Sequence, residues 1–446
     1  REWRSRDLFG STSVTEKGNI GIYYGWVIVF AAFITLGISF GIWYSYSVFI
    51  LAVIREFNWS TAAASSVFSI FIISHSTFAM AAGYLQDRFG PRVVVPAGSL
   101  LLAVSLIVTS WSENLWHFQL TYGVFAGAGI SLTAFVSHSA FLPKWFERKR
   151  GLALGIATAG IGLGMLLIVP FSEKMISAYG WRSAYRILAA IVLFIVAPLN
   201  LILGRKSPEA ISQHPDGDIP GNPRGAKPSS WVMEIIDKKW AAIDWDLLKA
   251  SRTLTFWYLI GAFGFISFAF QGVLLHAVAA MVDAQLSKST AAYVFGLAGI
   301  MGSVGKILFG CLSDKLGRER AKFIADVIAI LGILALTFIS SAHSPMTFIF
   351  AIFFGIGYGA AAPLIPAITA DIFIGRHYGL IFSFIAIGGG IGAAVGTYTV
   401  GLLRDTSGDY TAGFIVCCLS LAISCILVFL AAPGKVRRMK KIRFSS

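Results

Sequence analysis

The sequence is poor in charged residues and has no paired-cysteine pattern. Only 13% of its 446 residues are charged, and 22 acidic residues stand against 36 basic ones. The four cysteines, Cys311, Cys417, Cys418 and Cys425, form no CxxC or Cys/His spacing, so the sequence indicates no metal site and no redox motif. It also holds no nucleophile–base set and no phosphate-binding loop. We therefore expect neither an enzyme nor a nucleotide-driven pump, and no cofactor.

Charge is scarce because apolar residues fill the chain. Hydrophobic residues make up 56% of the sequence, and its mean hydropathy is +0.74. Apolar runs of roughly 18 residues or more recur along it, and each is long enough to cross a ~30 Å hydrocarbon layer as a helix. Backbone groups inside lipid must be paired internally, which favours helices and excludes isolated strands there. Residues 1–19 lack the apolar core of a signal peptide, so no cleavage is expected. The fold class predicted is an all-α polytopic membrane protein.

Twelve spans are predicted, joined by short polar turns and by one long connection at 205–253. Residues 207–230 are rich in Pro, Gly and Ser, which is typical of a flexible linker. Residues 232–253 predict a short amphipathic helix on the membrane surface, using Trp240, Trp245, Leu247 and Leu248. The domains expected are an N-terminal segment (1–23), a six-helix bundle (24–204), the linker (205–253), a second six-helix bundle (254–431) and a basic tail (432–446). The predicted spans are 24–52, 62–84, 93–111, 116–142, 151–171, 182–204, 254–282, 290–312, 321–341, 346–368, 378–403 and 410–431.

Basic residues are distributed unevenly among the predicted turns. If the N-terminus is cytoplasmic, 29 of the 36 lysines and arginines fall in cytoplasmic segments, six fall on the other side, and Lys306 lies within a span. An excess of basic residues in cytoplasmic loops is the rule for helical membrane proteins. It accounts for the net charge of +14 without nucleic acid as a partner. We expect a multi-pass protein of the cell (inner) membrane, in contact with the lipid bilayer and with both termini in the cytoplasm.

Two motifs recur in the two halves with nearly the same spacing. GYLQDRFGPR begins at residue 83 and GCLSDKLGRER at residue 310, an offset of 227. RGLALGIATAGIGLG aligns with YGLIFSFIAIGGGIG at an offset of 228. Two unrelated motifs with nearly one offset indicate a six-plus-six duplication, whose parallel repeats place a substrate site between the halves near mid-depth. The matched turn residues are Gly83, Asp87, Arg88 and Gly90 in the first half and Gly310, Asp314, Lys315 and Gly317 in the second. The second motif matches Gly151, Gly160, Gly162 and Gly164 with Gly379, Gly388, Gly390 and Gly392.

The repeated turn resembles the G-x-L-x-D-R-x-G-x-R motif of the major facilitator superfamily, with Lys315 for arginine in the second copy. Further segments are similar to the branch of the monocarboxylate transporters and oxalate:formate antiporters: YYGWVIVFAAF in span one, KWFERKRGLALGIATAG after span four and DWDLLKASRTLTFWYLI before span seven. The resemblance covers the whole chain. It implies a monomeric secondary transporter of small organic anions that works by alternating access. Asp87 and Arg88 would then exchange charge pairs at neighbouring helix ends between conformations.

Lys306 lies inside the eighth predicted span. A lysine at the centre of a spanning helix costs about 2.5–3.5 kcal/mol on insertion scales, so it needs a cavity, a partner or a ligand. Snorkelling to the cytoplasmic surface is the alternative, although the Cα–Cβ bond tilts Lys306 toward mid-membrane. Small residues share its helix face and predict open space beside it, or else close helix packing. These residues are Gly299, Gly302, Ser303 and Gly310. No other span carries a clear acidic residue at depth, which favours a carboxylate substrate as the anionic partner.

The resemblance agrees with the place of Lys306 but not with its identity. Monocarboxylate transporters have arginine at this position, four residues after an aspartate, and Gly302 stands in the place of that aspartate here. Oxalate:formate antiporters have a second base in span eleven, which this sequence lacks. One cation favours a monocarboxylate, such as lactate or pyruvate, over a dicarboxylate. Proton symport and carboxylate exchange without proton coupling both stay open, as does a non-transporting sensor with 205–253 as its output.

Other polar and aromatic residues are candidates for the substrate site. Gln271 lies in span seven, and His276, five residues further on, points about 140° away from it. Histidine titrates near neutral pH, so His276 is a candidate for proton transfer. Phe135 shares a face of span four with His138. The predicted substrate-binding residues are Lys306, His276, Gln271, Tyr358, Phe354, Phe135 and Tyr44, and Lys306 and His276 are also the candidates for proton coupling.

Overall fold

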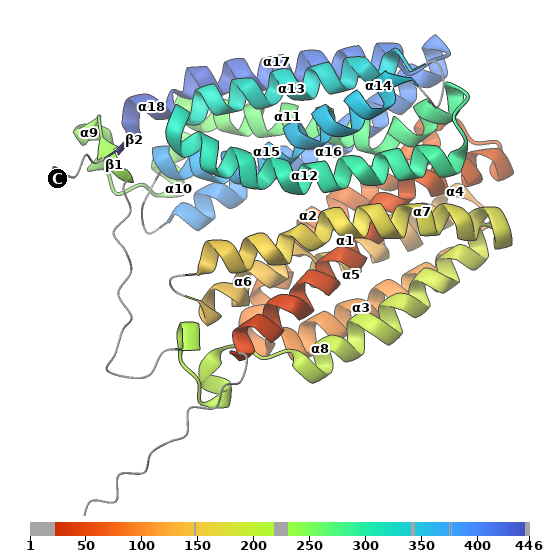
Figure 1. Cartoon of the computed structure of the whole chain (residues 1–446), viewed down its shortest axis with the longest axis horizontal. Coiled ribbons are helices and arrows are strands. Elements are labelled where there is room, and N and C mark those ends of the chain that lie inside the picture. The colour runs from red at the N-terminus through yellow and green to blue at the C-terminus, as the bar shows by residue number, and fades with distance from the viewer. Residues whose placement is uncertain are drawn as a thin grey trace, which may run out of the picture.

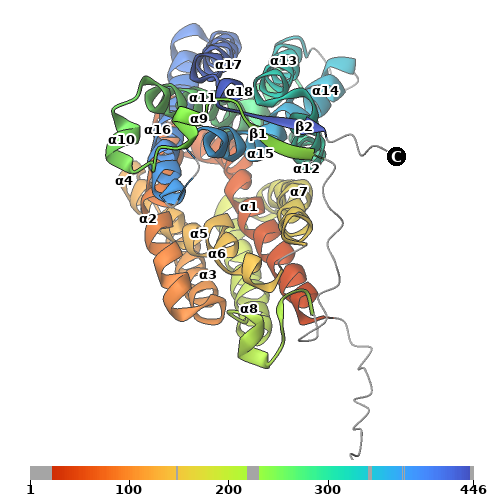
Figure 2. The same cartoon turned by 90° about the vertical axis from the view of Figure 1, so that its left-hand side faces the viewer.

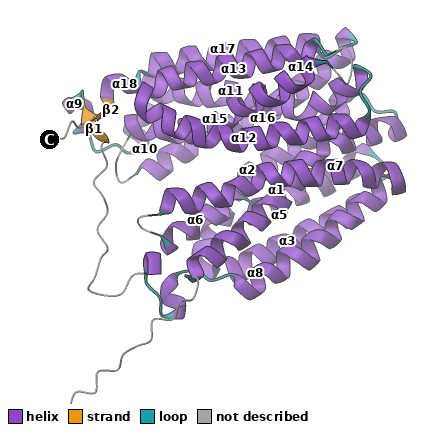
Figure 3. Ribbon diagram, in the orientation of Figure 1, coloured by secondary structure: helices purple, strands orange, loops and turns teal. Residues whose placement is uncertain are grey.

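The computed structural model consists of two groups of long helices that lie side by side (Figure 1), joined by short loops (Figure 3). It describes residues 23–146, 149–217, 231–339, 344–373, 375 and 377–441. The first group of helices ends at residue 203, and the second begins at residue 254. Most of the predicted N-terminal segment and the last residues of the predicted tail lie outside the described residues.

The first half contains spans one to six, several of them divided into shorter helices. Span four is made of α-helical pieces on either side of a π-helical turn, and spans five and six follow each other across a kink at Gly180 (φ 78°). The elements are α1 (Tyr24–Phe57), α2 (Thr61–Phe89), α3 (Pro91–Thr109), α4 (Leu115–Phe118), η1 (Gln119–Ala126), α5 (Gly127–Thr133), α6 (Phe135–Trp145), α7 (Arg150–Ile191), η2 (Val192–Val196) and α8 (Ala197–Leu203).

The second half repeats this order of spans after a connection with short elements of its own. The connection contains η3 (Pro208–Ile211), η4 (Pro215–Gly217), β1 (Trp231–Ile235), α9 (Lys238–Ala241) and α10 (Leu247–Ser251). The second half contains α11 (Leu254–Asp283), α12 (Lys288–Leu316), α13 (Arg318–Thr337), α14 (Pro345–Ile349), η5 (Phe350–Phe354), α15 (Gly355–Ile372), α16 (Tyr378–Ser407), α17 (Thr411–Ala431), α18 (Pro433–Val436) and β2 (Arg437–Lys441).

The number of helices confirms the predicted all-α membrane fold. By length and composition, 10 of the described helical segments are long and apolar enough to cross a membrane. One of these, Arg150–Leu203, turns at Gly180 and holds two spans. The helix α13 adds the remaining span, and the charged residues in its first half set it apart from the other segments. These segments correspond to the twelve predicted spans.

The glycines of the second repeated motif make equivalent contacts in the two halves. An added Cβ at Gly160 would lie 2.2 Å from the Phe33 carbonyl oxygen of α1, and at Gly388 it would lie 2.7 Å from the Ile260 carbonyl oxygen of α11. These glycines therefore let α7 and α16 approach the first helix of their own half closely. The duplication predicted from the sequence thus appears as matched helix packing.

The middle glycine of the same motif faces the opposite half in each copy. An added Cβ at Gly162 would lie 2.4 Å from the Gly299 carbonyl oxygen of α12. At Gly390 it would lie 2.7 Å from the Ser76 hydroxyl of α2. These two glycines therefore mark where the halves meet, α7 against α12 and α16 against α2.

The halves meet at one end of the helices and diverge at the other (Figure 1, Figure 2). We call the end that carries both motif turns (89–91 and 316–318) and the two strands the motif end. At the opposite end, Asp405 of α16 accepts hydrogen bonds from the backbone N–H groups of Thr61 (2.8 Å) and Ala62 (2.7 Å). At the motif end, an added Cβ at Gly151 or at its repeat partner Gly379 would meet no atom within 4 Å. The structure is therefore closed at the opposite end and open at the motif end.

A two-stranded sheet joins the connection to the tail at the motif end. The strands β1 and β2 pair antiparallel, with Ile235 opposite Arg437. The Trp245 ring packs against Phe373 of the second half with a centroid distance of 5.1 Å, and the Trp240 indole donates to the Ile372 carbonyl oxygen at 2.9 Å. The predicted amphipathic helix is therefore wrong: 232–253 form a strand and two short helices whose tryptophans pack on protein. Residues 218–230 of the predicted linker lie outside the described residues.

Candidate functional site

A pair of tyrosines bridges the two halves near the middle of the molecule. The hydroxyl groups of Tyr44 in α1 and Tyr358 in α15 lie 2.5 Å apart. Tyr358 also packs against Phe354 (centroid distance 6.1 Å) and Phe270 (5.4 Å). When one hydroxyl donates to the other, the accepting hydroxyl keeps its own proton for a further acceptor. The structure thus brings together three predicted site residues: Tyr44, Tyr358 and Phe354.

Lys306 lies one helical turn from this tyrosine pair. An added Cβ at Gly302, four residues before Lys306 in α12, would lie 3.4 Å from the Tyr358 ring. Lys306 is half-buried, and no hydrogen bond or ion pair joins its ammonium group to another described side chain. The absent partner agrees with the prediction from sequence, where the aspartate of the resembled family is replaced by Gly302.

The small residues on the Lys306 face pack helices together. An added Cβ at Gly299 would lie 2.7 Å from Met165 of α7, and one at Gly305 would lie 2.2 Å from the Ile356 carbonyl oxygen of α15. Within the predicted stripe, Gly299 thus follows the alternative expectation of close helix packing, whereas an added Cβ at Gly310 would meet its nearest atom only at 4.0 Å. The missing side chains of Gly299 and Gly305 let α12 lie between α7 and α15, which holds Lys306 close to both halves.

Gln271 has an acceptor atom that is buried without a partner. Its Oε1 atom makes no hydrogen bond with any described residue. It follows Phe270, whose ring contacts Tyr358, so Gln271 lies at the level of the tyrosine pair. Two further buried atoms without a partner are the Nε1 of Trp43 and the Nδ1 of His75, whose rings meet edge to face at 4.8 Å. Buried polar groups are normally satisfied, so these unpaired atoms are candidates for contact with water or a ligand.

His276 lies in a different part of the molecule from Lys306. Its Nε2 atom donates to the Thr397 carbonyl oxygen at 3.0 Å and lies 3.3 Å from the Ser65 hydroxyl of α2. Counting 1.5 Å per residue along α11 and α12, His276 lies roughly 18 Å farther from the motif end than Lys306. The structure therefore does not bring the two predicted proton-coupling residues together, and His276 belongs to the closed contact between α2 and α16.

Span four breaks beside the other predicted aromatic residue. Ala134 has extended backbone (φ −89°, ψ −162°) and separates α5 from α6. Phe135, which follows it, is 43% exposed, whereas His138 is buried and its Nδ1 lies 3.0 Å from the Ala134 carbonyl oxygen. Both residues lie in α6, as the shared helix face requires, but they differ in exposure. Sequence reasoning placed an unbroken helix here because no proline or glycine marks residue 134.

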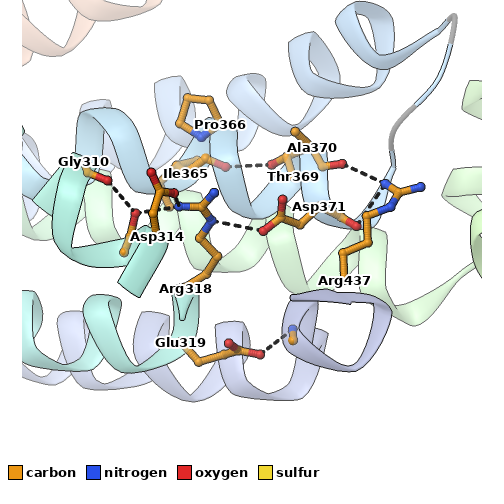
Figure 4. A network of polar contacts seen from close by, with 12 residues as sticks. Gly310, Asp314, Arg318, Glu319, Ile365, Pro366, Thr369, Ala370, Asp371 and Arg437 are labelled. Atoms are coloured by element: carbon orange, nitrogen blue, oxygen red, sulfur yellow. Dashed lines mark hydrogen bonds and ion pairs between the residues drawn. The ribbon is translucent and has the colours of Figure 1, made fainter. Parts of the chain in front are cut away.

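The two repeated turns carry different charge networks. In the first half, Lys144 at the end of α6 forms an ion pair with Asp87 at 3.0 Å, and Arg88 stands over the Phe89 ring. In the second half, Arg318 binds Asp314 at 2.6 Å and Asp371 at 3.0 Å (Figure 4). The spacings match: Lys144 follows Asp87 by 57 residues, and Asp371 follows Asp314 by 57 residues.

The tail extends the network of the second turn, as Figure 4 shows. Arg437 at the start of β2 donates to the carbonyl oxygens of Ala370 and Asp371, both at 3.3 Å. Glu319 accepts a hydrogen bond from the backbone N–H of Gly434 at 2.7 Å. Sequence reasoning named the turn residues but missed Arg318 and Arg437, although GRER after the motif was the available signal. Lys315, which it did name, is exposed.

Sequence reasoning also missed buried acidic residues inside two spans. Asp326 of α13 is buried and paired with Lys322 of the same helix. Glu173 of α7 is buried, and its Oε1 accepts a hydrogen bond from Ser177 at 2.7 Å. Neither residue pairs with Lys306, so neither is the acidic partner whose absence the sequence predicted. Asp326 lies inside the predicted span 321–341, which was the signal that could have found it, whereas Glu173 falls two residues beyond the predicted span 151–171.

Comparison with known proteins relates the whole chain to membrane transporters. A family model described as Major Facilitator Superfamily matches residues 31–354 and 341–445. The chain is 29% identical to monocarboxylate transporter 13 of Bos taurus over 88% of this chain and 86% of that protein. It is 25% identical to monocarboxylate transporter 12 of Homo sapiens over 97% of this chain and 84% of that one.

A bacterial relative and a solved structure agree with this. The uncharacterized MFS-type transporter YcxA of Bacillus subtilis is 27% identical over 86% of this chain and 89% of that protein. In fold, the chain is similar to a bacterial homolog of the human lysosomal transporter Spinster in an inward-facing and occupied conformation. That likeness has a TM-score of 0.68 at 16% identity, over 92% of this chain and 97% of the other.

Proposed function

Since the chain belongs to the major facilitator superfamily, we propose that it is a secondary active transporter of small monocarboxylates, with Lys306 as the carboxylate-binding residue. The two halves would rock about the contacts of α7 with α12 and of α2 with α16. The motif end would face the cytoplasm, because most basic residues lie in the segments at that end. The structure, open at this end, would then be the cytoplasm-facing state.

The observation that carries this proposal is the unpaired ammonium group of Lys306 beside the tyrosine pair. A half-buried cation without an ionic partner favours an anion that arrives as a ligand. Lys306 would bind one carboxylate oxygen through a charge-assisted hydrogen bond. The free hydroxyl proton of the Tyr44–Tyr358 pair is one turn away and would suit a second oxygen, such as a hydroxyl or keto group. Relatives that are named monocarboxylate transporters support the same substrate class.

Uptake of labelled lactate into proteoliposomes tests the proposal. Because Lys306→Gln removes the charged donor, it is expected to weaken apparent affinity about tenfold to a hundredfold. Lys306→Arg keeps the charge and is expected to retain uptake. Lys239→Gln, at an exposed lysine of α9 outside the motif turns, is the control and should transport like the wild type. Full uptake by Lys306→Gln would contradict the proposal.

Carboxylate exchange without proton coupling is the second candidate. It is favoured by Gly302, which leaves Lys306 without a neighbouring acid to carry a proton. A permanently charged Lys306 would then allow only the loaded carrier to reorient. Uptake that requires internal carboxylate and ignores an imposed pH gradient would select this mechanism, and competition by oxalate or formate would identify its substrates.

A further inference from the structure

Glu173 is buried between the two halves at the end opposite the motif end. It lines a cavity of about 10 Å³ together with Val48 of α1, Val278 of α11 and Lys288 of α12. Such a volume has room for roughly one water molecule. Residues of both halves line this cavity, with Glu173 contributed by the first half and Lys288 by the second.

Glu173 differs from the other buried carboxylates in its partners. Among the described residues, Asp326 and Asp371 are also buried, and each forms an ion pair with a basic side chain. Glu173 forms none within the described chain, and its carboxylate accepts a hydrogen bond from the hydroxyl of Ser177. Burying a carboxylate charge is costly unless it is paired, so a proton on Glu173 would remove that cost in the closed state.

Few of the side chains around Glu173 could neutralise the negative charge of its carboxylate. The α1 and α11 sides of the cavity are apolar, with Val48, Leu51, Ala52 and Val278. The α12 side contributes Lys288, which is half-buried and makes no ion pair with Glu173. The neighbouring Lys174 of α7 is directed to Tyr293 of α12, with its ammonium group 5.7 Å from the ring centroid.

We propose that Glu173 is the site that accepts a transported proton from the side opposite the motif end. When the halves part there, Lys288 moves away with α12 and water reaches the carboxylate. A proton taken up on Glu173 then makes the group neutral, and the halves close over it. The environment of Glu173 thus differs between the two states, which a coupling site requires. This inference rests on the proposed carboxylate transport, and it supplies the acidic group that Gly302 does not.

Glu173→Gln tests the proposal because glutamine keeps the shape of a protonated glutamate. Lactate accumulation in a gradient of one pH unit and lactate counterflow without a gradient are measured in proteoliposomes. If one proton moves with each anion, the wild type accumulates lactate about tenfold. Glu173→Gln is expected to accumulate none and to keep counterflow. The matched control is Glu113→Gln, an exposed carboxylate in the α3–α4 loop, which should accumulate like the wild type.

The outcomes separate this proposal from the proposed function. Accumulation by Glu173→Gln at the wild-type level overturns the proton site. Wild-type counterflow without any response to pH also overturns it, and leaves Lys306 as the carboxylate site. Absence of all carboxylate transport by the wild type overturns both. Lys306→Gln is expected to lose counterflow and accumulation together, unlike Glu173→Gln.

A second variant covers the case in which Glu173→Gln does not fold. Ser177→Ala removes the hydroxyl that donates to the Glu173 carboxylate and leaves the cavity wall unchanged. Because a donor to a carboxylate favours its charged form, the pH midpoint of lactate uptake is expected to move. A midpoint equal to that of the wild type overturns the proposal.

Discussion

The two copies of the repeated turn have almost the same sequence but hold charge in different ways. The first copy pairs Asp87 with Lys144, and these side chains are 66% and 39% exposed. The second copy has carboxylates at both matching positions, and Arg318 lies between them. Asp371 is 8% exposed and the Arg318 side chain 13%. The same motif therefore forms a surface ion pair in one half and a largely buried three-residue network in the other.

The difference follows from what covers each turn. In the second half, β2 and the connection lie over the ends of α13 and α15, and Arg437 completes the network from the tail. In the first half, the Asp87 and Lys144 side chains face open space at the motif end. Charges removed from water interact more strongly than exposed ones and leave a larger penalty when one partner is lost. Both halves keep the turn, but the segments that cover the second copy make its ion pairs stronger than the exposed pair of the first copy.

The largest effect is expected from breaking the covered network. Arg318→Ala leaves Asp371 buried and Asp314 close to it without their shared cation, so the free energy of unfolding should fall by about 3 kcal/mol. Thermal unfolding in detergent measures the loss. Arg320→Ala, an exposed arginine two residues later, is the control and should change little. Equal stability of the two variants would mean that the network contributes nothing beyond a surface pair.

A smaller effect is expected from removing the contribution of the tail. Arg437→Ala deletes two charge-assisted hydrogen bonds to carbonyl oxygens at the end of α15, so stability should fall by about 2 kcal/mol. Hydrogen exchange of the backbone amides of β1 should also become faster, because β1 pairs with the strand that Arg437 anchors. Lys435→Ala serves as the control, since Lys435 is exposed. Unchanged exchange in β1 would show that the sheet does not depend on this anchor.

The smallest effect is expected at the exposed pair of the first half. Lys144→Ala should lower stability by about 0.5 kcal/mol, because exposed ion pairs contribute little. Salt at about 0.5 M should reduce even this difference, because the Debye length falls to about 4 Å and exposed charges are then strongly screened. Lys144→Arg is expected to behave like the wild type. A loss as large as that of Arg318→Ala would end the distinction between the two turns.

Much of the architecture could be predicted from the sequence because the same motifs repeat along the chain. The offsets of 227 and 228 predicted matched halves, and the glycine contacts of α7 and α16 confirm them. The fold was accessible in this way because helix length and motif spacing are local properties. The amphipathic helix at 232–253 was wrong because the pairing of β1 with β2 joins residues about two hundred positions apart.

The candidate site was readable only in part. Lys306 was conspicuous because a lysine inside an apolar span is costly wherever its neighbours lie. The tyrosine pair joins two residues 314 positions apart, and no local pattern encodes a distance of that kind. For the same reason, the sequence indicated His276 as a candidate for proton coupling and did not indicate Glu173. One is enclosed by the α2–α16 contact, and the other lines a cavity made by four helices.

By itself, the sequence determined the membrane class, the twelve spans, the duplication and the lysine inside the eighth span, because each depends on composition or on spacing along the chain. The tertiary structure decided which charges are covered and which are exposed. It also decided which glycines of the second motif contact the opposite half. It alone distinguished the two copies of the turn and isolated Glu173 between the halves. Burial depends on the segments that pack around a residue, and those segments lie far from it in the chain.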